Sequence, residues 1–140
     1  MAYWLVKSEP EDFSWDEQVK RGAKGEVWTG VRNFTARRYL GEMKKDDRVF
    51  FYHTGDEKQV VGIAEVVKEA HPDPTASKGE PWIAVDLKAV VPLTRPVTLS
   101  AIKAEKSLKA MALVKYSRLS VQPVTPEEWK TVCKMGGVKG

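Results

Sequence analysis

Three short stretches of the sequence join polar side chains to a predicted strand end or helix start. They are Lys7–Pro10 (KSEP), Trp28–Asn33 (WTGVRN) and Arg118–Gln122 (RLSVQ). Strand ends and helix starts present backbone donors without a partner inside the element, so these positions suit ligand binding. In the second stretch, Gly30 allows close backbone approach and Arg32 adds a charged fork. Together they would hold a phosphate or a carboxylate well.

Each of these residues also has an ordinary structural interpretation. Asn33 is a common type of helix cap, Trp28 a common type of core residue, and Arg32 a common partner for an acid. Taken singly, each residue type serves structure more often than ligand binding. The functional interpretation therefore depends on several such residues acting together.

The distribution of charge points weakly to nucleic acid. The net charge is +4, from 23 Lys and Arg against 19 Asp and Glu. The segment Val97–Thr125 holds five basic residues against the single acid Glu105, an excess equal to that of the whole chain. A second basic cluster lies between Val27 and Gly41, without an acid, and consists of Arg32, Arg37 and Arg38. Basic groups beside aromatic rings suit nucleic-acid binding, but a solvated basic face would look the same.

Composition excludes several other classes of protein. The single cysteine, Cys133, forms no internal disulfide and is expected as a half-buried thiol in a reducing compartment. The two histidines, His53 and His71, lie in different segments without zinc-ligand spacing, so we expect no metal and no cofactor. No apolar run approaches the ~20 residues of a membrane span, and the N-terminal residues do not resemble a signal peptide. We therefore expect a cytoplasmic protein, or a nuclear one in a eukaryote, with no membrane partner.

The elements that must position the three stretches follow from hydrophobic pattern and capping residues. Strands are predicted at Tyr3–Lys7, Asp47–Thr54, Gln59–Glu69, Trp82–Val91 and Arg118–Pro123. Helices are predicted at Ser14–Arg21, Phe34–Met43, Thr98–Ile102, Ser107–Leu113 and Thr125–Lys134. The second and third strands form a hairpin, and the loop His71–Pro81 is rich in proline. This order favours one α+β domain over residues 1–140, with flanking short helices around a small, largely antiparallel barrel or curved sheet.

Five motifs, in sequence order, resemble the EVE domain family over essentially the whole chain. They are YWLVKSEP (Tyr3–Pro10), WTGVRNFTARRYL (Trp28–Leu40), VFFYHT (Val49–Thr54), VVGIAEVVKEAHPDPTA (Val60–Ala76) and SRLSVQPVTPEEW (Ser117–Trp129). The resemblance implies a PUA-like fold, a small mixed β-barrel with flanking helices that is related to YTH domains. It also implies a non-catalytic reader of a modified base in DNA or RNA, which holds a flipped-out base in an aromatic pocket.

The resemblance also assigns roles to individual residues. The base pocket would be formed by Ser8, Glu9, Trp28, Gly30, Val31, Arg32, Asn33, Tyr52, His53, Leu119 and Ser120. Flanking phosphates would be held by Arg32, Arg37, Arg38 and Arg118. Many relatives have Tyr after the motif's Asn, where this chain has Phe34, so the hydroxyl at that position is missing.

The physics of base eversion agrees with this assignment. Unstacking a base costs a few kcal/mol, and stacking on an aromatic ring returns ~1–3 kcal/mol per base. Trp28 is the predicted stacking surface, which requires an accessible cleft beside its ring. The Ser8 hydroxyl, the Asn33 amide and backbone groups near Val31 and Ser120 would read the base edge. A buried methyl group adds only ~0.8 kcal/mol, so the site must also reject the unmodified base.

Two other functions fit the same residues. A hydrolytic enzyme acting on nucleic acid or a modified nucleoside could use Glu9 and His53 as a general acid–base pair, assisted by Ser8 or Tyr52. A sensor could instead hold a free modified nucleoside or another planar anion. Salt separates the sensor from the reader, because binding of a polymer weakens steeply with added salt. A monomer is the working expectation, although the sequence leaves dimerisation open.

Overall fold

The computed structural model describes residues 1–139. The strands are β1 (Tyr3–Ser8), β2 (Glu26–Val27), β3 (Arg48–His53), β4 (Gln59–Pro72), β5 (Ile83–Thr98) and β6 (Val121–Val124). The α-helices are α1 (Trp15–Lys20), α2 (Phe34–Glu42), α3 (Leu99–Ala104), α4 (Ala112–Lys115) and α5 (Pro126–Gly136). Two short 3-10 helices are η1 (Gly22–Lys24) and η2 (Lys106–Leu108).

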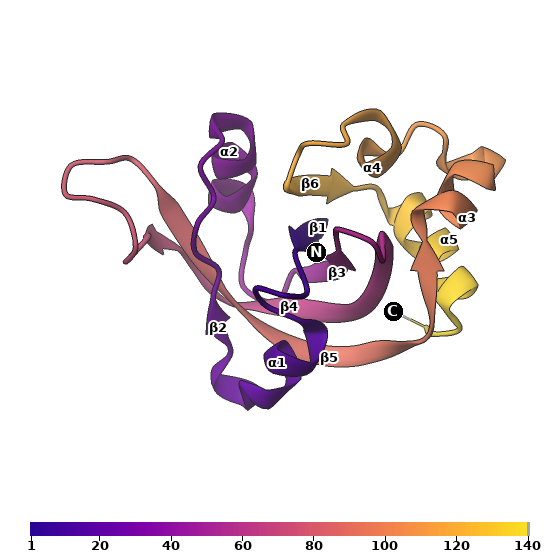
Figure 1. The fold of residues 1–140 in the computed structure, drawn as a ribbon, viewed down its shortest axis with the longest axis horizontal. Coiled ribbons are helices and arrows are strands. Elements are labelled where there is room, and N and C mark those ends of the chain that lie inside the picture. Colours follow the sequence, from indigo (N-terminus) through magenta and orange to yellow (C-terminus); the bar gives the residue numbers. More distant parts are fainter. Residues whose placement is uncertain (140) are drawn as a thin grey trace.

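The six strands form one mixed sheet in the order β2-β5-β4-β3-β1-β6. Within residues 1–139, only β1 and β3 pair in parallel, from Tyr3 opposite Arg48 to Ser8 opposite His53. All other neighbouring strands pair antiparallel, including the predicted hairpin of β3 and β4. The long strands β4 and β5 curve around β1 and β3, as Figure 1 shows. The predicted α+β class with a small mixed sheet is therefore confirmed, but the barrel is open, because the edge strands β2 and β6 do not pair among the described residues.

Strand β5 is much longer than its sequence predicts. The pattern ended the strand at Val91, but β5 continues to Thr98 through Pro92 and Pro96. Proline lacks the backbone N–H, so a strand tolerates it where that edge has no partner strand or where the hydrogen-bond pattern between strands is irregular. Beyond Leu87, β5 has β4 as its only described partner, and their register shifts several times along the pair.

The alternating side chains of the central strands separate two apolar clusters. In β3, Phe51 packs in one cluster with Trp28 and Trp15, and Phe50 packs in the other with Trp129. The Phe50 and Trp129 rings stack with their centroids 3.8 Å apart, which fixes α5 against the sheet. Helix α5 begins with the predicted capping box at Thr125.

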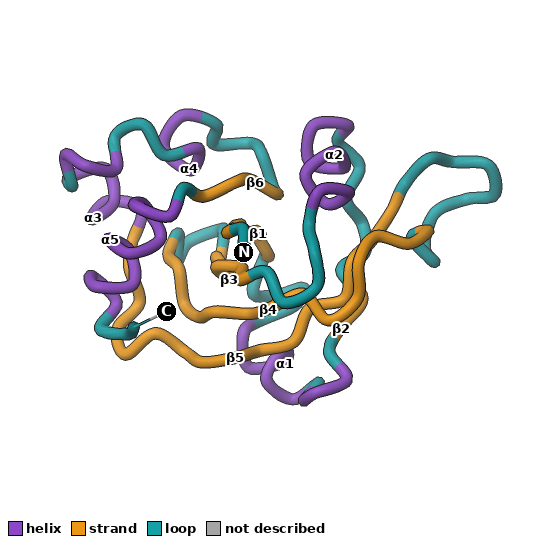
Figure 2. The backbone as a smooth tube through the Cα atoms, turned by 180° about the vertical axis from the view of Figure 1, so that it is seen from behind, coloured by secondary structure: helices purple, strands orange, loops and turns teal. Residues whose placement is uncertain are grey.

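Helix α2 lies at the opening between the two sheet edges. It contacts β6, β5 and β4, and the view from behind in Figure 2 shows it beside β6 at one end of the sheet. The Asn33 side chain caps α2 by accepting a hydrogen bond from the Ala36 N–H at 3.0 Å. The segments before α2 and before β6 therefore meet at this opening. No helix of the described residues is long and apolar enough to cross a membrane.

Candidate functional site

A cavity of about 500 Å³ opens where the end of β1, α1, β2 and the loop before α2 converge. We refer to it as the Trp28 cavity. Its lining residues are Lys7, Ser8, Glu9, Asp12, Phe13, Glu17, Arg21, Glu26, Val27, Trp28, Thr29, Gly30, Val31, Arg32 and Ser120. Seven of the eleven predicted pocket residues are among them: Ser8, Glu9, Trp28, Gly30, Val31, Arg32 and Ser120. Its volume lies within the range of ~300–1,000 Å³ that is typical of small-molecule sites.

The aromatic part of the cavity wall combines two rings. Trp28 is 8% exposed and belongs to the core, yet it borders the cavity. Its ring meets Phe13 and Phe51 edge-on, with centroids 6.1 and 5.5 Å away. Phe13 is half-buried and also lines the cavity. A planar ligand in the cavity would therefore meet two aromatic side chains held firmly from behind.

The loop before α2 is tied to a buried carboxylate that is distant in sequence. Asp73 accepts hydrogen bonds from the Gly30 N–H at 2.9 Å and from the Arg32 guanidinium at 3.0 Å. Burial opposes ionisation of Asp73, but hydrogen bonds from Thr75, Gly30 and Arg32 outweigh it and lower its pKa to about 2. Gly30 has a φ of +85°, a conformation that glycine adopts without strain. Arg32 is therefore held by contacts within the protein although its side chain is exposed, and it also lies over the Trp82 ring.

The polar wall of the cavity offers mainly hydrogen-bond acceptors. The Ser8 hydroxyl donates its proton to the Phe13 carbonyl, so its oxygen is left to accept from a ligand. Glu9 accepts a hydrogen bond from the Thr54 hydroxyl at 3.2 Å. The exposed Asp12 forms no side-chain hydrogen bond or ion pair with a described residue. These carboxylates match a ligand that carries an amino group.

The other two carboxylates of the Trp28 cavity have structural roles. Glu17 closes the capping box of α1 by accepting from the Ser14 N–H at 3.1 Å. Glu26 pairs with Arg21 at 3.0 Å. Glu17 and Glu26 therefore shape the cavity wall. Glu9 and Asp12 have fewer partners within the protein, so their carboxylates can accept hydrogen bonds from a ligand.

Lys7 connects the cavity to the segment that precedes β6. Its ammonium group donates to the Ser117 carbonyl at 2.8 Å, and its backbone N–H donates to the Ser120 carbonyl at 3.0 Å. Burial lowers the pKa of Lys7. This side chain thus fixes the 117–120 segment against the end of β1.

Two residues predicted for the base pocket and one predicted to bind phosphate line a second cavity instead. Asn33, Leu119 and Arg118 line a cavity of about 560 Å³ between α2 and the segment after α4. We call it the Tyr116 cavity; its complete lining is Asn33, Thr35, Tyr39, Lys115, Tyr116, Ser117, Arg118 and Leu119. The Asn33 amide oxygen is occupied in capping α2, which leaves its NH₂ group as a donor.

Tyr52 and His53 lie behind the Trp28 cavity rather than in its lining. Tyr52 is buried in the Phe50 cluster, and burial raises its pKa. His53 accepts from the Trp15 N–H at 3.0 Å through Nε2, and its Nδ1 lies 2.8 Å from the Glu57 carboxylate. Both ring nitrogens are thus occupied, and the structure does not form the hypothesised Glu9–His53 acid–base pair.

The remaining predicted phosphate-binding arginines lie on α2, where both make contacts within the protein. The Arg37 Nε donates to the Pro81 carbonyl at 2.6 Å, which holds the loop 73–82 near α2. Arg38 lies 3.7 Å from Glu42 one turn later and over the Tyr39 ring. In contrast, the exposed Arg118 has no ion pair with a described residue.

Comparison with known proteins places this geometry in a family. The model of the EVE domain matches residues 2–135. The chain belongs to the EVE domain family. It is 35% identical to mouse thymocyte nuclear protein 1 over 164 residues, which cover 95% of this chain and 73% of the mouse protein. The predicted family is thereby confirmed, and the chain is similar to the thymocyte nuclear protein 1 members of that family.

Solved structures of this EVE domain's relatives share its fold. A protein from Rhodopseudomonas palustris is 60% identical, with a TM-score of 0.92, over 98% of this chain and 94% of that one. The human THYN1 protein, solved in complex with DNA containing 5-methylcytosine, is 32% identical, with a TM-score of 0.90, over 100% of both chains. A YTH domain from Zygosaccharomyces rouxii is similar in fold, with a TM-score of 0.59 at 20% identity. The predicted PUA-like fold is therefore confirmed.

Sequence reasoning missed the second aromatic ring of the cavity, Phe13, and the acceptor Asp12. Phe13 and Asp12 follow the KSEP motif directly, and Lys7 belongs to it. The sequence did carry a signal for these residues. The KSEP motif ends β1 and the capping box of α1 begins at Ser14, so the short segment between them must lie close to the motif. No group of three or more His, Cys, Asp or Glu that could hold a metal ion occurs within residues 1–139.

Proposed function

We propose that this EVE domain is a non-catalytic reader of a modified base in nucleic acid, and that the Trp28 cavity holds the everted base. The carrying observation is the cavity itself, in which Trp28 and Phe13 stand beside the carboxylates of Glu9, which also accepts from Thr54, and of Asp12. The human THYN1 protein was solved with DNA containing 5-methylcytosine, and the chain in that structure shares this fold. That complex supports a similar ligand for this chain.

The acceptors of the cavity favour a base with an exocyclic amino group. Carboxylates accept from the N4 amino group of cytosine and the N6 amino group of adenine, whereas thymine and guanine present the carbonyl oxygens O4 and O6 at the corresponding positions. Glu9, Asp12 and the Ser8 oxygen would repel such a carbonyl. We therefore propose a modified cytosine or adenine as the class of ligand.

The firm support of the cavity wall matters for selectivity. Asp73 anchors Gly30 and Arg32, and Phe51 backs Trp28, so the wall cannot easily adjust to a base of another shape. A pre-formed site spends little binding energy on ordering itself. A methyl group contributes only ~0.8 kcal/mol by burial, so a rigid wall that fits poorly around the unmodified base would supply the remaining discrimination.

A blocking variant tests this proposal without disturbing the core. Thr29 is exposed and lines the cavity, so Thr29→Trp would fill the site, while Thr29→Ser leaves it open. Binding is measured by fluorescence anisotropy with matched DNA and RNA strands, single and double, with and without 5-methylcytosine or N6-methyladenine. Wild type and Thr29→Ser should prefer one modified strand, and Thr29→Trp should lose that preference.

Two results would contradict the proposal. Equal affinity of wild type for every modified and plain strand would refute modified-base reading. A preference that survives in Thr29→Trp would refute the Trp28 cavity as its site. Salt addresses the sensor alternative, because binding of a free modified nucleoside with no preference for the strand would respond little to added salt.

The non-catalytic part of the proposal rests on the occupied His53. The hydrolytic alternative pairs Glu9 with His53, and both nitrogens of His53 already have other partners. We further propose that residues 1–140 act as one domain. We place the protein with its nucleic-acid partner in the cytoplasm, or in the nucleus if the source is a eukaryote.

A further inference from the structure

The Tyr116 cavity differs in chemistry from the Trp28 cavity. Its lining contains two cations, Lys115 and Arg118, together with the rings of Tyr39 and Tyr116 and no carboxylate. The Trp28 cavity contains four carboxylates and three cations. An anionic ligand with planar groups would therefore be attracted to the Tyr116 cavity and not to the Trp28 cavity.

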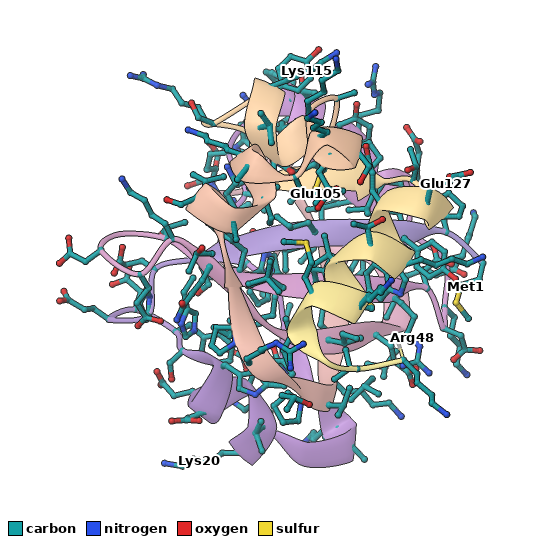
Figure 3. The ribbon with its side chains drawn as sticks, turned by 90° about the vertical axis from the view of Figure 1, so that its right-hand side faces the viewer. Met1, Lys20, Arg48, Glu105, Lys115 and Glu127 are labelled. Carbon is teal, nitrogen blue, oxygen red and sulfur yellow. The ribbon has the colours of Figure 1, made fainter. Side chains whose placement is uncertain are left out.

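The cations of the Tyr116 cavity are available for a ligand. Arg32 and Arg38 pair with Asp73 and Glu42, but neither Lys115 nor Arg118 forms an ion pair within residues 1–139. Figure 3 shows Lys115 at the outer end of the molecule, opposite Lys20 of α1. Unpaired, exposed cations beside an aromatic ring are the elements of a phosphate-tracking surface.

The aromatic group of the cavity is also exposed. Tyr116 is 58% exposed, although its backbone is fixed by a hydrogen bond to the Ala112 carbonyl at 2.7 Å. Lys115 and Tyr116 also border a smaller hollow of about 270 Å³ that contains Glu128. The Glu128 carboxylate is engaged in capping α5 through the Thr125 N–H at 3.0 Å. The Tyr116 ring is exposed and the carboxylate of this hollow is already engaged, so the ring can stack on a base of a bound nucleic-acid strand.

The linings of the two cavities meet at consecutive residues of the chain. Ser120 lines the Trp28 cavity and its neighbour Leu119 the Tyr116 cavity, and the same change of side occurs between Arg32 and Asn33. This boundary is fixed on the strand side, because Lys7 holds Ser117 and Ser120. A nucleic-acid strand that leaves the Trp28 cavity past these residues would therefore reach the Tyr116 cavity next.

We infer that the Tyr116 cavity binds the nucleotide next to the everted base on the same strand. Lys115 and Arg118 would contact its phosphates, and Tyr116 would stack on its base. This inference rests on the proposed function of the Trp28 cavity and adds a second subsite to it. Phosphate contacts and base stacking carry little sequence information. The second subsite should therefore raise the affinity for the strand without changing the preference for the modified base.

The test separates affinity from discrimination. Single strands with one central modified base, the one that wild type prefers, are titrated at several salt concentrations with wild type, Tyr116→Ala and the double variant Lys115→Ala/Arg118→Ala. The matched control is Lys103→Ala/Lys106→Ala, which removes two exposed cations of the same segment outside the cavity. The free modified nucleoside serves as a ligand for the Trp28 cavity alone.

The expected results are specific to the second subsite. Each phosphate contact contributes about 0.7 to the slope of log K against log salt for single strands, so the double variant should lose about 1.4 of slope. Tyr116→Ala should lower strand affinity at least about fivefold, as expected for one lost stacking contact. Both variants should keep the wild-type ratio of modified to plain strand and the wild-type affinity for the nucleoside.

Three outcomes would overturn the inference. In the first, the slope and affinity of the cavity variants equal those of wild type or of the control pair, while wild type still prefers modified strands; the reader function then stands and the second subsite fails. In the second, the variants change the ratio of modified to plain strand, which would place base reading in the Tyr116 cavity. In the third, wild type shows no preference at all, and the proposed function fails together with the inference.

Discussion

Asp73→Asn is expected to remove a charge-dependent stabilisation that connects two distant segments of the fold. The Asp73 side chain is 0% exposed, and it receives hydrogen bonds from Gly30, Arg32 and Thr75. Its pKa falls from 3.8 to about 2 in the folded protein. One pKa unit corresponds to about 1.4 kcal/mol, so the ionised carboxylate adds about 2 kcal/mol to the free energy of unfolding.

The sign of the pH dependence follows from the lowered pKa. Because folding favours the ionised form, the stabilisation is complete only above the unfolded-state pKa of 3.8. It is lost as the pH falls through the folded-state value of about 2. The difference in unfolding free energy between wild type and Asp73→Asn should therefore be about 2 kcal/mol at about pH 6 and become small at about pH 2.

Urea unfolding followed by tryptophan fluorescence at several pH values measures this difference. Comparing the variant with wild type cancels the titration of the other carboxylates, which both proteins share. Asp56→Asn, a change of an exposed acid in the turn 55–58, is the matched control and should shift stability little at any pH. A constant difference between wild type and Asp73→Asn from about pH 6 to about pH 2 would refute the assignment to the charge of Asp73.

Two further predictions concern backbone and thiol. Gly25→Ala should cost at least about 1 kcal/mol more in urea unfolding than Gly79→Ala. Both glycines have positive φ, but a Cβ at Gly25 would lie 2.6 Å from the Leu87 carbonyl oxygen and one at Gly79 would meet open space; equal losses would contradict this. Burial raises the pKa of Cys133 to about 11, so an aromatic disulfide reagent at about pH 8 should label the thiol only in denaturant. Rapid labelling of the native protein would show that the thiol is accessible.

Local sequence patterns identified most of the elements because their signals span only a few residues. Ser14 with Glu17 and Thr125 with Glu128 each predict a capping box, and both are present. Short runs of apolar and aromatic residues predicted β1 and β3 within a residue or two. Elements without a local signal were missed, such as the two-residue strand β2, which exists because it pairs with Asp86 and Leu87.

The three stretches singled out by their residue types do meet, but the tertiary structure divided them in a way that no local pattern reveals. Neighbours such as Arg32 and Asn33, or Leu119 and Ser120, line different cavities. The motif order was sufficient to indicate the family and the seven residues around Trp28. The sequence alone did not reveal which arginines remain free, because a partner can lie far away in the chain. Arg32, for example, pairs with Asp73, 41 residues away. Side-chain types and spacing are properties of the chain, whereas the pairing of a charge and the burial of a ring depend on which remote segments the fold brings beside them.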